Sequence, residues 1–388
     1  MPASLTNHAA DTTSLQKKLP HISVYSSGDW PQISHFWEEL EKSSPYSSFY
    51  LSTDWTASWL EIFGELLEPQ LLVFKNDEFA VGVCLLVESK ERRGPFRVNR
   101  VFLNTSGGDI AERTLMEFNS LLCREGWEDA VSQALSNRLQ TLRWDEFAVD
   151  GIFPGKVLSS LEQHIPQSPT SFDRPSFYVN LDQLRSENKA FQNTLSANTR
   201  AQLRRSIKLY SEIGEIRLQI ASCIAEAESF FEELRAMHQL RWEHLGEIGA
   251  FPPGRRLEFH RALIRRAFPK GSIQMLRVSA GAETIGVLYN FVRKGKVYFF
   301  QSGFHYKPDQ RLKPGLVTHA CAIQHCLEAG FSEYDLLAGD ARYKRSLAKD
   351  CRQMAWVIFS RPSLKLALIE KLRSIKRVIK KSAAAGSP

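Results

Sequence analysis

The stretch that decides the fold runs Tyr334-Asp335-Leu336-Leu337-Ala338-Gly339-Asp340-Ala341-Arg342-Tyr343-Lys344. A short apolar strand there ends directly in a cluster of ionisable side chains, and such strand ends are where α/β proteins place binding and catalytic groups. The preceding segment, Pro314 to Gly330, is predicted to be a helix because Pro-Gly opens it and a glycine closes it. We therefore expect a helix, a strand and a charged loop in succession, with Asp340, Arg342, Tyr343 and Lys344 exposed to a polar substrate.

Predicted helices and strands alternate along the remaining chain. Strands are expected at 22–25, 71–74, 80–87, 100–103, 141–149, 177–180, 272–279, 283–293, 296–303, 334–337 and 354–359, and further helices at 33–42, 54–63, 127–136, 194–212, 225–245 and 255–268. This order predicts an α/β fold (α+β, mixed sheet). A Ser/Pro-rich stretch at 166–176 divides the chain into predicted domains at 21–165 and 170–361, after a disordered leader at 1–20 and before a tail at 362–388.

The two predicted domains share one short pattern. Leu71 to Val83 can be laid against Met275 to Val287 at a constant offset of 204 residues, so that Gly82 falls on Gly286. Both segments are β-hairpins whose second strand begins with apolar-Gly-apolar. The match indicates either two unrelated ordinary hairpins or a duplicated domain, and the residues alone leave both open.

Composition limits the class of protein. The 388 residues are 43% hydrophobic, enough for two cores, and carry a formal net charge of +7, which suits an anionic ligand such as a nucleotide, a coenzyme or a phospholipid surface. The six cysteines form no CxxC pair and are expected to be reduced core residues. We find no signal peptide and no run long enough to span a membrane, so a cytoplasmic protein is expected.

A second candidate site lies at Lys313-Pro314-Gly315-Leu316, where a glycine just inside a helix start leaves backbone N–H groups open to an anion. Arg311 and Lys313 would add positive charge beside a phosphate-bearing ligand. The alternative is that Pro-Gly only begins a helix.

Two predicted helices carry further candidates. Arg200, Arg204 and Lys208 share one helix face, which is either a solvated basic surface or the wall of a cleft for an anionic substrate. Residues 237–244 bring His238 beside Trp242, and we predict His238 or Glu243 as a proton acceptor, with a core or salt-bridged role as the alternative.

Two further expectations concern metals and membranes. No histidine spacing fits a metal site, so no metal is expected. The tail at 363–381 forms a predicted basic amphipathic helix that either packs on the body or lies on an anionic membrane, which would place the protein at the inner membrane face.

These residues together resemble the GNAT superfamily. The resemblance rests on the element order, the apolar-Gly-apolar hairpin, the Pro314-Gly315 helix start and the ending Tyr-Asp-Leu-Leu-x-Gly-Asp-x-x-Tyr-Lys. The segment at 196–208 is similar to a Ser…Arg-Arg helix of the BioF2-like (CelD, cellulose-biosynthesis-type) acetyltransferase branch, which is related to the Fem aminoacyltransferases.

The resemblance implies two tandem GNAT-like domains and therefore favours duplication. It also implies an acyl-CoA, such as acetyl-CoA, bound by the second domain between splayed strands 296–303 and 334–337. The implied coenzyme-binding residues are Arg311, Lys313, Gly315, Leu316, Gln301 and Ser302. Tyr343 would protonate the leaving thiolate, Glu243, His238 or Asp340 would take the acceptor's proton, and Lys344, Arg342, Trp242, Arg200 and Arg204 would contact substrate.

The chain also departs from that family. Where the family commonly has Gly-Asp-Glu-Pro-Tyr-Lys, this sequence has Gly339-Asp340-Ala341-Arg342-Tyr343-Lys344, so an acid is replaced and a cation is gained. The acidic residue usual after the fourth strand is His305 or Tyr306 here. Arg342 therefore points to an anionic acceptor.

The resemblance supports three functional hypotheses. The first is an acyl-CoA-dependent acyltransferase acting on a small-molecule or glycan acceptor of the cell envelope or of polysaccharide synthesis. The second is Fem-like transfer from aminoacyl-tRNA, in which the helix around Arg200 binds tRNA, and otherwise no nucleic acid is expected. The third is a non-catalytic GNAT pair that acts as a membrane-associated scaffold.

Overall fold

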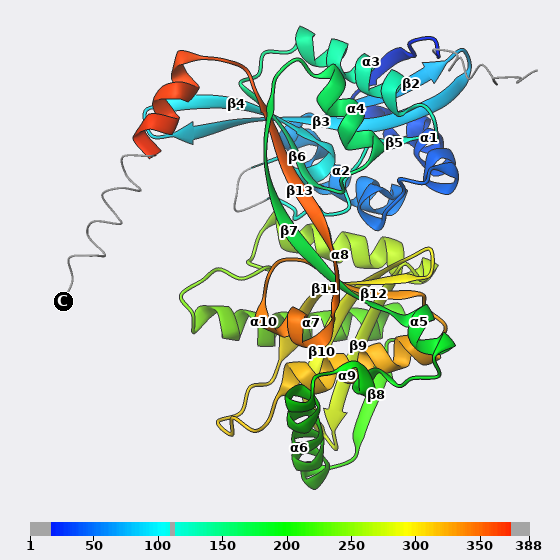
Figure 1. Cartoon of the computed structure of the whole chain (residues 1–388), viewed down its shortest axis with the longest axis vertical. Coiled ribbons are helices and arrows are strands. Elements are labelled where there is room, and N and C mark those ends of the chain that lie inside the picture. Colours follow the sequence, from blue (N-terminus) through cyan, green and yellow to red (C-terminus); the bar gives the residue numbers. More distant parts are fainter. Residues whose placement is uncertain (1–16, 109–112, 374–388) are drawn as a thin grey trace, which may run out of the picture.

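A computed structural model describes residues 17–108 and 113–373. Most of the predicted leader, 1–16, and the end of the predicted tail, 374–388, lie outside the described residues. The chain forms one long mixed sheet with helices on both faces (Figure 1), in the order β1-β2-β3-β4-β6-β13-β7-β12-β11-β10-β9-β8, with short β5 paired to β3. The predicted mixed α/β class is confirmed.

The first half of the molecule runs from β1 to α4. Its strands are β1 (His21–Tyr25), β2 (Gln70–Asn76), β3 (Phe79–Arg93), β4 (Phe96–Leu103), β5 (Leu122–Cys123) and β6 (Glu146–Ile152). Its helices are α1 (Trp30–Ser43), α2 (Thr53–Leu67), α3 (Glu128–Thr141) and α4 (Lys156–His164). Leu71 and Val73 face the core under α1 and α2, whereas Leu72 and Phe74 face the core under α3 and α4, as the alternation of a strand requires.

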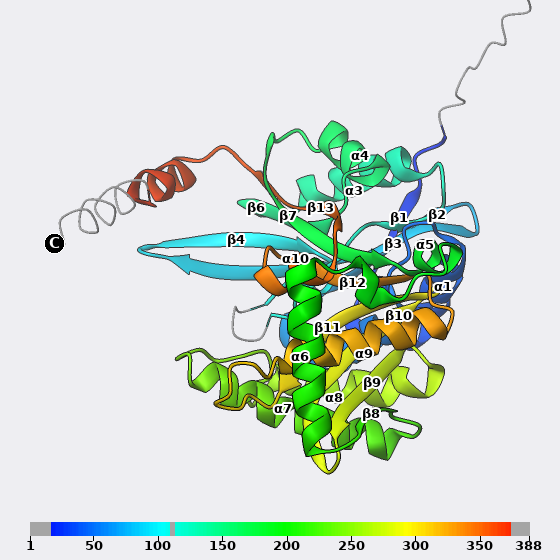
Figure 2. The same ribbon diagram turned by 60° about the horizontal axis from the view of Figure 1, so that its bottom comes forward.

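The second half runs from β7 to β13. Its strands are β7 (Pro169–Asn180), β8 (Ile216–Ile220), β9 (Ile273–Ala280), β10 (Glu283–Arg293), β11 (Lys296–Phe304), β12 (Glu333–Ala338) and β13 (Asp350–Ser360). Its helices are α5 (Leu181–Ser186), α6 (Ala197–Ile213), α7 (Ile224–Glu243), α8 (Arg255–Ala267), α9 (Pro314–Glu328) and α10 (Arg342–Leu347). Figure 2 shows α6 and α9 in front of this part of the sheet.

The two halves have the same strand pairing. In each half three antiparallel pairs are followed by one parallel pair, β4 with β6 and β11 with β12. The register also repeats, because Phe74 pairs with Gly82 and Val278 pairs with Gly286, each 204 residues further on. The offset in the sequence therefore marks structurally equivalent positions, and the predicted tandem arrangement of two similar units is confirmed.

The last strand of the second half completes the sheet of the first half. β7 follows the first half in the chain but pairs with β12, and β13 follows β12 but pairs with β6. The two long strands also pair with each other, from Pro169–Phe359 to Tyr178–Asp350. The strands of the predicted domain at 170–361 thus include one that completes the first half's sheet.

A shared core also joins the halves. Helix α2 packs against α8, where the Trp55 and Phe259 ring centroids lie 4.9 Å apart and Arg266 Nε donates to Ser58 Oγ at 3.1 Å. Phe49 of the first half stacks on Phe291 of β10 at 4.2 Å. Aromatic burial on this scale stabilises the contact strongly, so the halves form one body.

Three local predictions were wrong. Residues 169–176, predicted as a linker, form the first part of β7, because β13 supplies a pairing strand that no local pattern reveals. The predicted charged loop after β12 becomes helix α10 from Arg342 onward. Cys223 and Cys351 are exposed rather than in the core, although all six cysteines are free.

Candidate active site

The candidate site lies where β11 and β12 separate. The two strands pair only from Lys296–Glu333 to Tyr298–Asp335, and a hollow opens beyond that point. Pairs Tyr289–Gln301 and Asn290–Phe299 leave Phe300 as an extra residue, so β11 bulges at the hollow. On β12, Leu337 has φ of +60°, and its N–H donates to the buried Asp335 carboxylate at 2.6 Å. Strained backbone of this kind often marks a functional site.

An inner cavity of about 470 Å³ fills this separation. Its wall is mostly apolar and aromatic, and it takes residues from both halves, since Tyr50, Leu115 and Glu117 of the first half face the second. The polar side chains on its wall are few, as is usual for a small-molecule pocket. They include His238, Gln301, Ser302, Tyr343 and Lys344.

An outer cavity of about 790 Å³ continues from it toward solvent. Six residues line both cavities: Arg241, Tyr306, Gly315, Leu316, Tyr343 and Ser346. The starts of α6 and α9 both face the outer cavity, through Asn198 and Thr199 and through Pro314 and Gly315. Lys307, Lys313 and Arg342 also line it, so this end of the cleft is basic.

The start of α9 can bind an anion in the outer cavity. The helix has no side-chain cap, so its first N–H groups remain available to an anion. A Cβ at Gly315 would lie 3.2 Å from the Phe304 ring, which shows how closely the backbone borders the cleft. The Lys313 N–H donates to Ser206 Oγ at 2.9 Å and fixes this loop to α6.

Glu117 is the acid inside the inner cavity. Its Oε2 accepts a hydrogen bond from the Ala338 N–H at 2.7 Å, at the end of β12. Burial raises the pKa of Glu117 to about 7, although the hydrogen bond and the positive charge of Lys344 favour its ionised form. A carboxyl with this pKa exchanges protons readily near neutrality, as a general base must.

Lys344 and Tyr343 follow β12 on α10. Lys344 is buried, and its Nζ donates to the carbonyl oxygens of Leu337 and Ala338 at 2.9 and 2.7 Å, so it holds the end of β12 in place. Tyr343 stacks on His319 with ring centroids 5.9 Å apart. Burial raises the pKa of Tyr343, so its hydroxyl keeps a proton to donate at neutral pH.

His238 uses both ring nitrogens within the protein. Nδ1 lies 3.0 Å from the Ser302 carbonyl oxygen, and Nε2 accepts from the Ala250 N–H at 3.0 Å. Burial lowers the pKa of His238, which keeps the ring neutral. This geometry favours a role in positioning β11 over the predicted role as a base.

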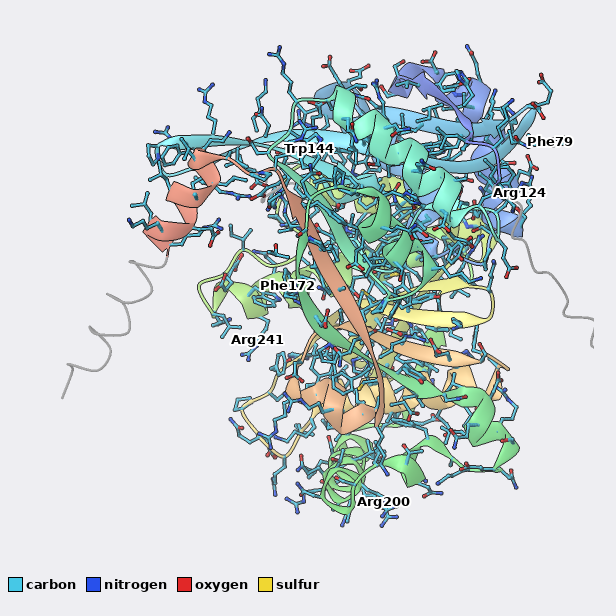
Figure 3. All side chains as sticks on the ribbon, turned by 45° about the horizontal axis from the view of Figure 1, so that its top comes forward. Phe79, Arg124, Trp144, Phe172, Arg200 and Arg241 are labelled. Carbon is cyan, nitrogen blue, oxygen red and sulfur yellow. The ribbon has the colours of Figure 1, made fainter. Side chains whose placement is uncertain are left out.

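The structure brings most of the predicted site residues together and leaves others outside. Those that line the cavities are His238, Trp242, Gln301, Ser302, Lys313, Gly315, Leu316, Arg342, Tyr343 and Lys344. Five predicted residues line neither cavity: Asp340, which pairs with Arg345; Arg311, which pairs with Asp309; and Glu243, Arg200 and Arg204. Figure 3 shows Arg200 on α6, well apart from Arg241 at the end of α7.

Sequence reasoning missed Glu117. It lies in the first half, 221 residues before the Ala338 N–H that it binds, and no spacing links the two. The only local signal is a single acid within the apolar run Leu115-Met116-Glu117-Phe118.

Comparison with known proteins now identifies the class. Residues 197–345 match the model of the acetyltransferase (GNAT) domain. The protein therefore carries a GNAT domain in its second half, and the predicted superfamily is confirmed. This domain places the protein in the acyltransferase class.

Three solved structures share the fold across both halves at low identity. FemX is 10% identical, covers 87% of this chain and 96% of its own, and has a TM-score of 0.56. A conserved protein from Bacteroides thetaiotaomicron is 10% identical over 88% of this chain and 100% of its own, with a TM-score of 0.52. The C-terminal domain of a protein described as a lysylphosphatidylglycerol synthetase, from Agrobacterium fabrum, is 11% identical over 88% and 96%, with a TM-score of 0.51. No curated protein matches the chain.

Two structural searches concern metals and membranes. Among residues 17–108 and 113–373, no group of three or more His, Cys, Asp or Glu side chains is placed to hold a metal ion. Within the same ranges, no helix combines the length and the apolar character needed to cross a membrane.

Proposed function

We propose that this protein is an acyl-CoA-dependent acyltransferase that modifies an amine or hydroxyl on a cell-envelope or polysaccharide-related acceptor. The observation that carries the proposal is one continuous cleft. Its outer cavity is basic and borders a helix start, its inner cavity is apolar, and a buried carboxyl with a pKa of about 7 lies in that inner cavity. A phosphate-bearing donor with an apolar acyl end and a nucleophilic acceptor fit these three parts.

In this proposal each residue has one task. Bound acyl-CoA would supply an activated thioester, and the cleft residues would bind it and transfer the protons. The amides at the start of α9, with Lys307 and Lys313, bind phosphate. Glu117 takes the proton from the acceptor as the acceptor attacks the thioester carbonyl, Tyr343 gives a proton to the leaving thiolate, and N–H groups near Gln301 polarise the carbonyl oxygen.

The acceptor would enter past the end of α7. Trp242 and Leu245 line the inner cavity and are themselves 36% and 52% exposed, so the entrance has an apolar edge. Arg241 lies over the Tyr306 ring at 5.0 Å, where the inner and outer cavities meet. Arg342 lines only the outer cavity, where it adds a cation beside the proposed donor phosphate.

Calorimetry with acetyl-CoA and longer acyl-CoAs tests the donor. We expect binding to the wild-type protein and its loss in Gly315→Glu, because a carboxylate at the start of α9 repels phosphate and occupies the cleft. Ala329→Glu, at the exposed other end of α9 where φ is −74°, is the control for added charge. Failure of every acyl-CoA to bind, or unchanged binding to Gly315→Glu, contradicts the proposal.

A second candidate, transfer from aminoacyl-tRNA, is supported by the surface of α6. Arg204, Arg205 and Lys208 are exposed there, next to the mouth of the outer cavity. The fold similarity to FemX is in line with this reading but shows the fold alone. Salt-sensitive tRNA binding that is lost in Arg204→Glu/Lys208→Glu, together with no acyl-CoA binding, would favour it over the first candidate.

We also propose that the tail rests on an anionic membrane surface at the inner membrane face. Within the described part of the tail, Leu364, Leu368 and Leu372 are 85%, 49% and 46% exposed at helical spacing, with Lys371 beside them. Lys365 Nζ donates to the Arg97 carbonyl oxygen at 2.9 Å and ties the helix to the body. Liposome binding that disappears with residues 363–388 would support this, and if no ligand binds the cleft, the scaffold hypothesis would replace the enzyme.

A further inference from the structure

A separate cavity of about 410 Å³ lies between the halves, behind the wall of the active site. Two segments form that shared wall. In the first, Glu117 faces the inner cavity while Phe118, Asn119 and Ser120 face this second cavity. In the second, β11 turns Tyr298 toward the second cavity and Phe299 to Ser302 toward the inner one. We call the second cavity the basic hollow.

Among the described residues, five cations and no carboxylate line the basic hollow. The cations are Lys156, Arg293, Lys294, Lys296 and Arg352. A surface of one charge sign in a concave, partly dry place concentrates ions of the opposite sign.

Three of the cations are fixed by carboxylates outside the lining. Arg293 pairs with Glu41, Lys296 pairs with Glu333 at 3.5 Å, and Arg352 pairs with Glu333 and Asp335. These pairs hold the side chains in position around the hollow. A ligand would therefore meet preorganised donors.

The other two cations make no salt bridge among the described residues, although the charge of Glu41 acts on Lys294 and that of Glu128 acts on Lys156. Lys294 Nζ donates only to the Ser44 carbonyl oxygen, at 3.2 Å, and burial together with the charge of Arg293 lowers the pKa of Lys294. Lys156 makes no ion pair within the described ranges and opens helix α4, whose start has no side-chain cap. A lysine pair and free helix N–H groups at one opening are what a phosphate needs.

The rest of the lining favours a ring next to that phosphate. Phe118 lies 5.0 Å from Phe153 and 4.8 Å from Tyr298, measured between ring centroids, and both contacts are edge-to-face. Hydroxyl groups of Ser47, Ser48 and Ser120 border the same cavity. Aromatic faces with nearby hydroxyls suit a sugar or a base.

We propose that the basic hollow is a second binding site, separate from the donor cleft, for a small phosphorylated ring compound such as a sugar phosphate or a nucleotide. The site needs neither acyl-CoA nor the chemistry proposed above. Because its wall contains Phe118, next to Glu117, a ligand there is also placed to influence the acceptor end of the active site.

Calorimetry on the full chain with glucose 1-phosphate, UMP and inorganic phosphate tests the proposal. We expect one of the two ring compounds to bind more tightly than phosphate alone, and Lys156→Gln/Lys294→Gln to weaken that binding by about tenfold or more, the loss of two charge-assisted contacts. Whichever ring compound binds identifies the source of the phosphate. Lys156→Gln alone, at an exposed position that cannot disturb folding, should weaken it severalfold.

The matched control is Lys307→Gln/Lys313→Gln, which removes two cations from the outer cavity. This pair should leave the ring compound bound within about twofold and should weaken acyl-CoA, so that failure of this site and failure of the donor site are separate results. Absence of binding by all three probes, unchanged binding in Lys156→Gln/Lys294→Gln, or loss of binding in the control pair would overturn the proposal.

Discussion

The two halves of this protein share one strand order but differ at the place where the parallel pair of strands separates. In the second half, β11 bulges at Phe300 and separates from β12, which leaves the inner cavity open. In the first half, β4 also leaves β6 after three pairs, but it keeps an unbroken register with β3 up to Leu103, and the buried residues 104–106 follow it. Asn104 has φ of +60°, and its side chain bonds Leu85 N, Asn119 Oδ1 and the Ser120 carbonyl oxygen at 3.1, 2.7 and 2.9 Å.

This difference shows how the two halves of a duplicated fold can take different roles in one active site. The first half contributes Glu117, whose carboxyl accepts the Ala338 N–H of the second half. One half would thus hold the donor while the other supplies the base. Four predictions test this division, from the largest expected effect to the smallest.

Glu117→Gln should lower kcat by about 10²–10⁴-fold, because the acceptor loses its base, and should leave acyl-CoA binding unchanged. The amide can still accept the Ala338 N–H, so the fold is kept. Steady-state kinetics with calorimetry measure both, and the exposed Glu125→Gln is the control. A fully active Glu117→Gln would mean that the first half takes no part in the chemistry.

The pH profile of kcat should rise through about 7, the pKa to which burial raises Glu117. The carboxylate is the active form, so activity is present above that pH and falls about tenfold per unit below it, to about one hundredth at pH 5. Lys344, Asp335 and Arg174 also act on this carboxyl. Glu117→Gln should lose this limb of the profile; an identical limb in the variant would assign it to another group.

Asn104→Ala should lower the free energy of unfolding by about 2–4 kcal/mol, since it leaves buried partners without hydrogen bonds. Activity should fall with it, because the same segment positions Glu117. Asn188→Ala is the matched control: its φ is also positive, at +48°, but it is exposed. Chemical denaturation compares the two, and equal losses would show that backbone strain alone matters.

Gly286→Ala should cost about 1–3 kcal/mol of stability, more than the equivalent Gly82→Ala. A Cβ at Gly286 would lie 2.6 Å from Phe304 and 2.7 Å from Thr318, whereas at Gly82 the nearest atoms, on Val131, are 3.1 Å away. Phe304 lines the cleft, so Gly286→Ala should also weaken acyl-CoA binding. A larger loss of stability in Gly82→Ala than in Gly286→Ala would contradict this prediction.

Much of the fold could be predicted from the chain. Hairpin 283–303 and helix 314–330 carry strong local patterns, and their predicted bounds fall within a few residues of β10, β11 and α9. The helix start at Pro314 followed from the same patterns, and its role in binding a donor stays a prediction. The role of Glu117 could not be predicted, since its partner, the Ala338 N–H, is defined only by tertiary structure. The first part of β7, residues 169–176, was missed for the same reason, because β13 makes it a strand.

The crossing of β7 and β13 has a consequence for biosynthesis. The sheet of the first half needs Asp350–Ser360, which leaves the ribosome only after nearly every other described residue has been made. Many N-terminal domains fold while the rest of the chain is still being translated. In this protein the first half cannot complete its sheet in that way. The edge of β6 that pairs with β13 stays unpaired until β13 has been synthesised. The sheet of the first half can therefore be completed only when the second half is also nearly complete.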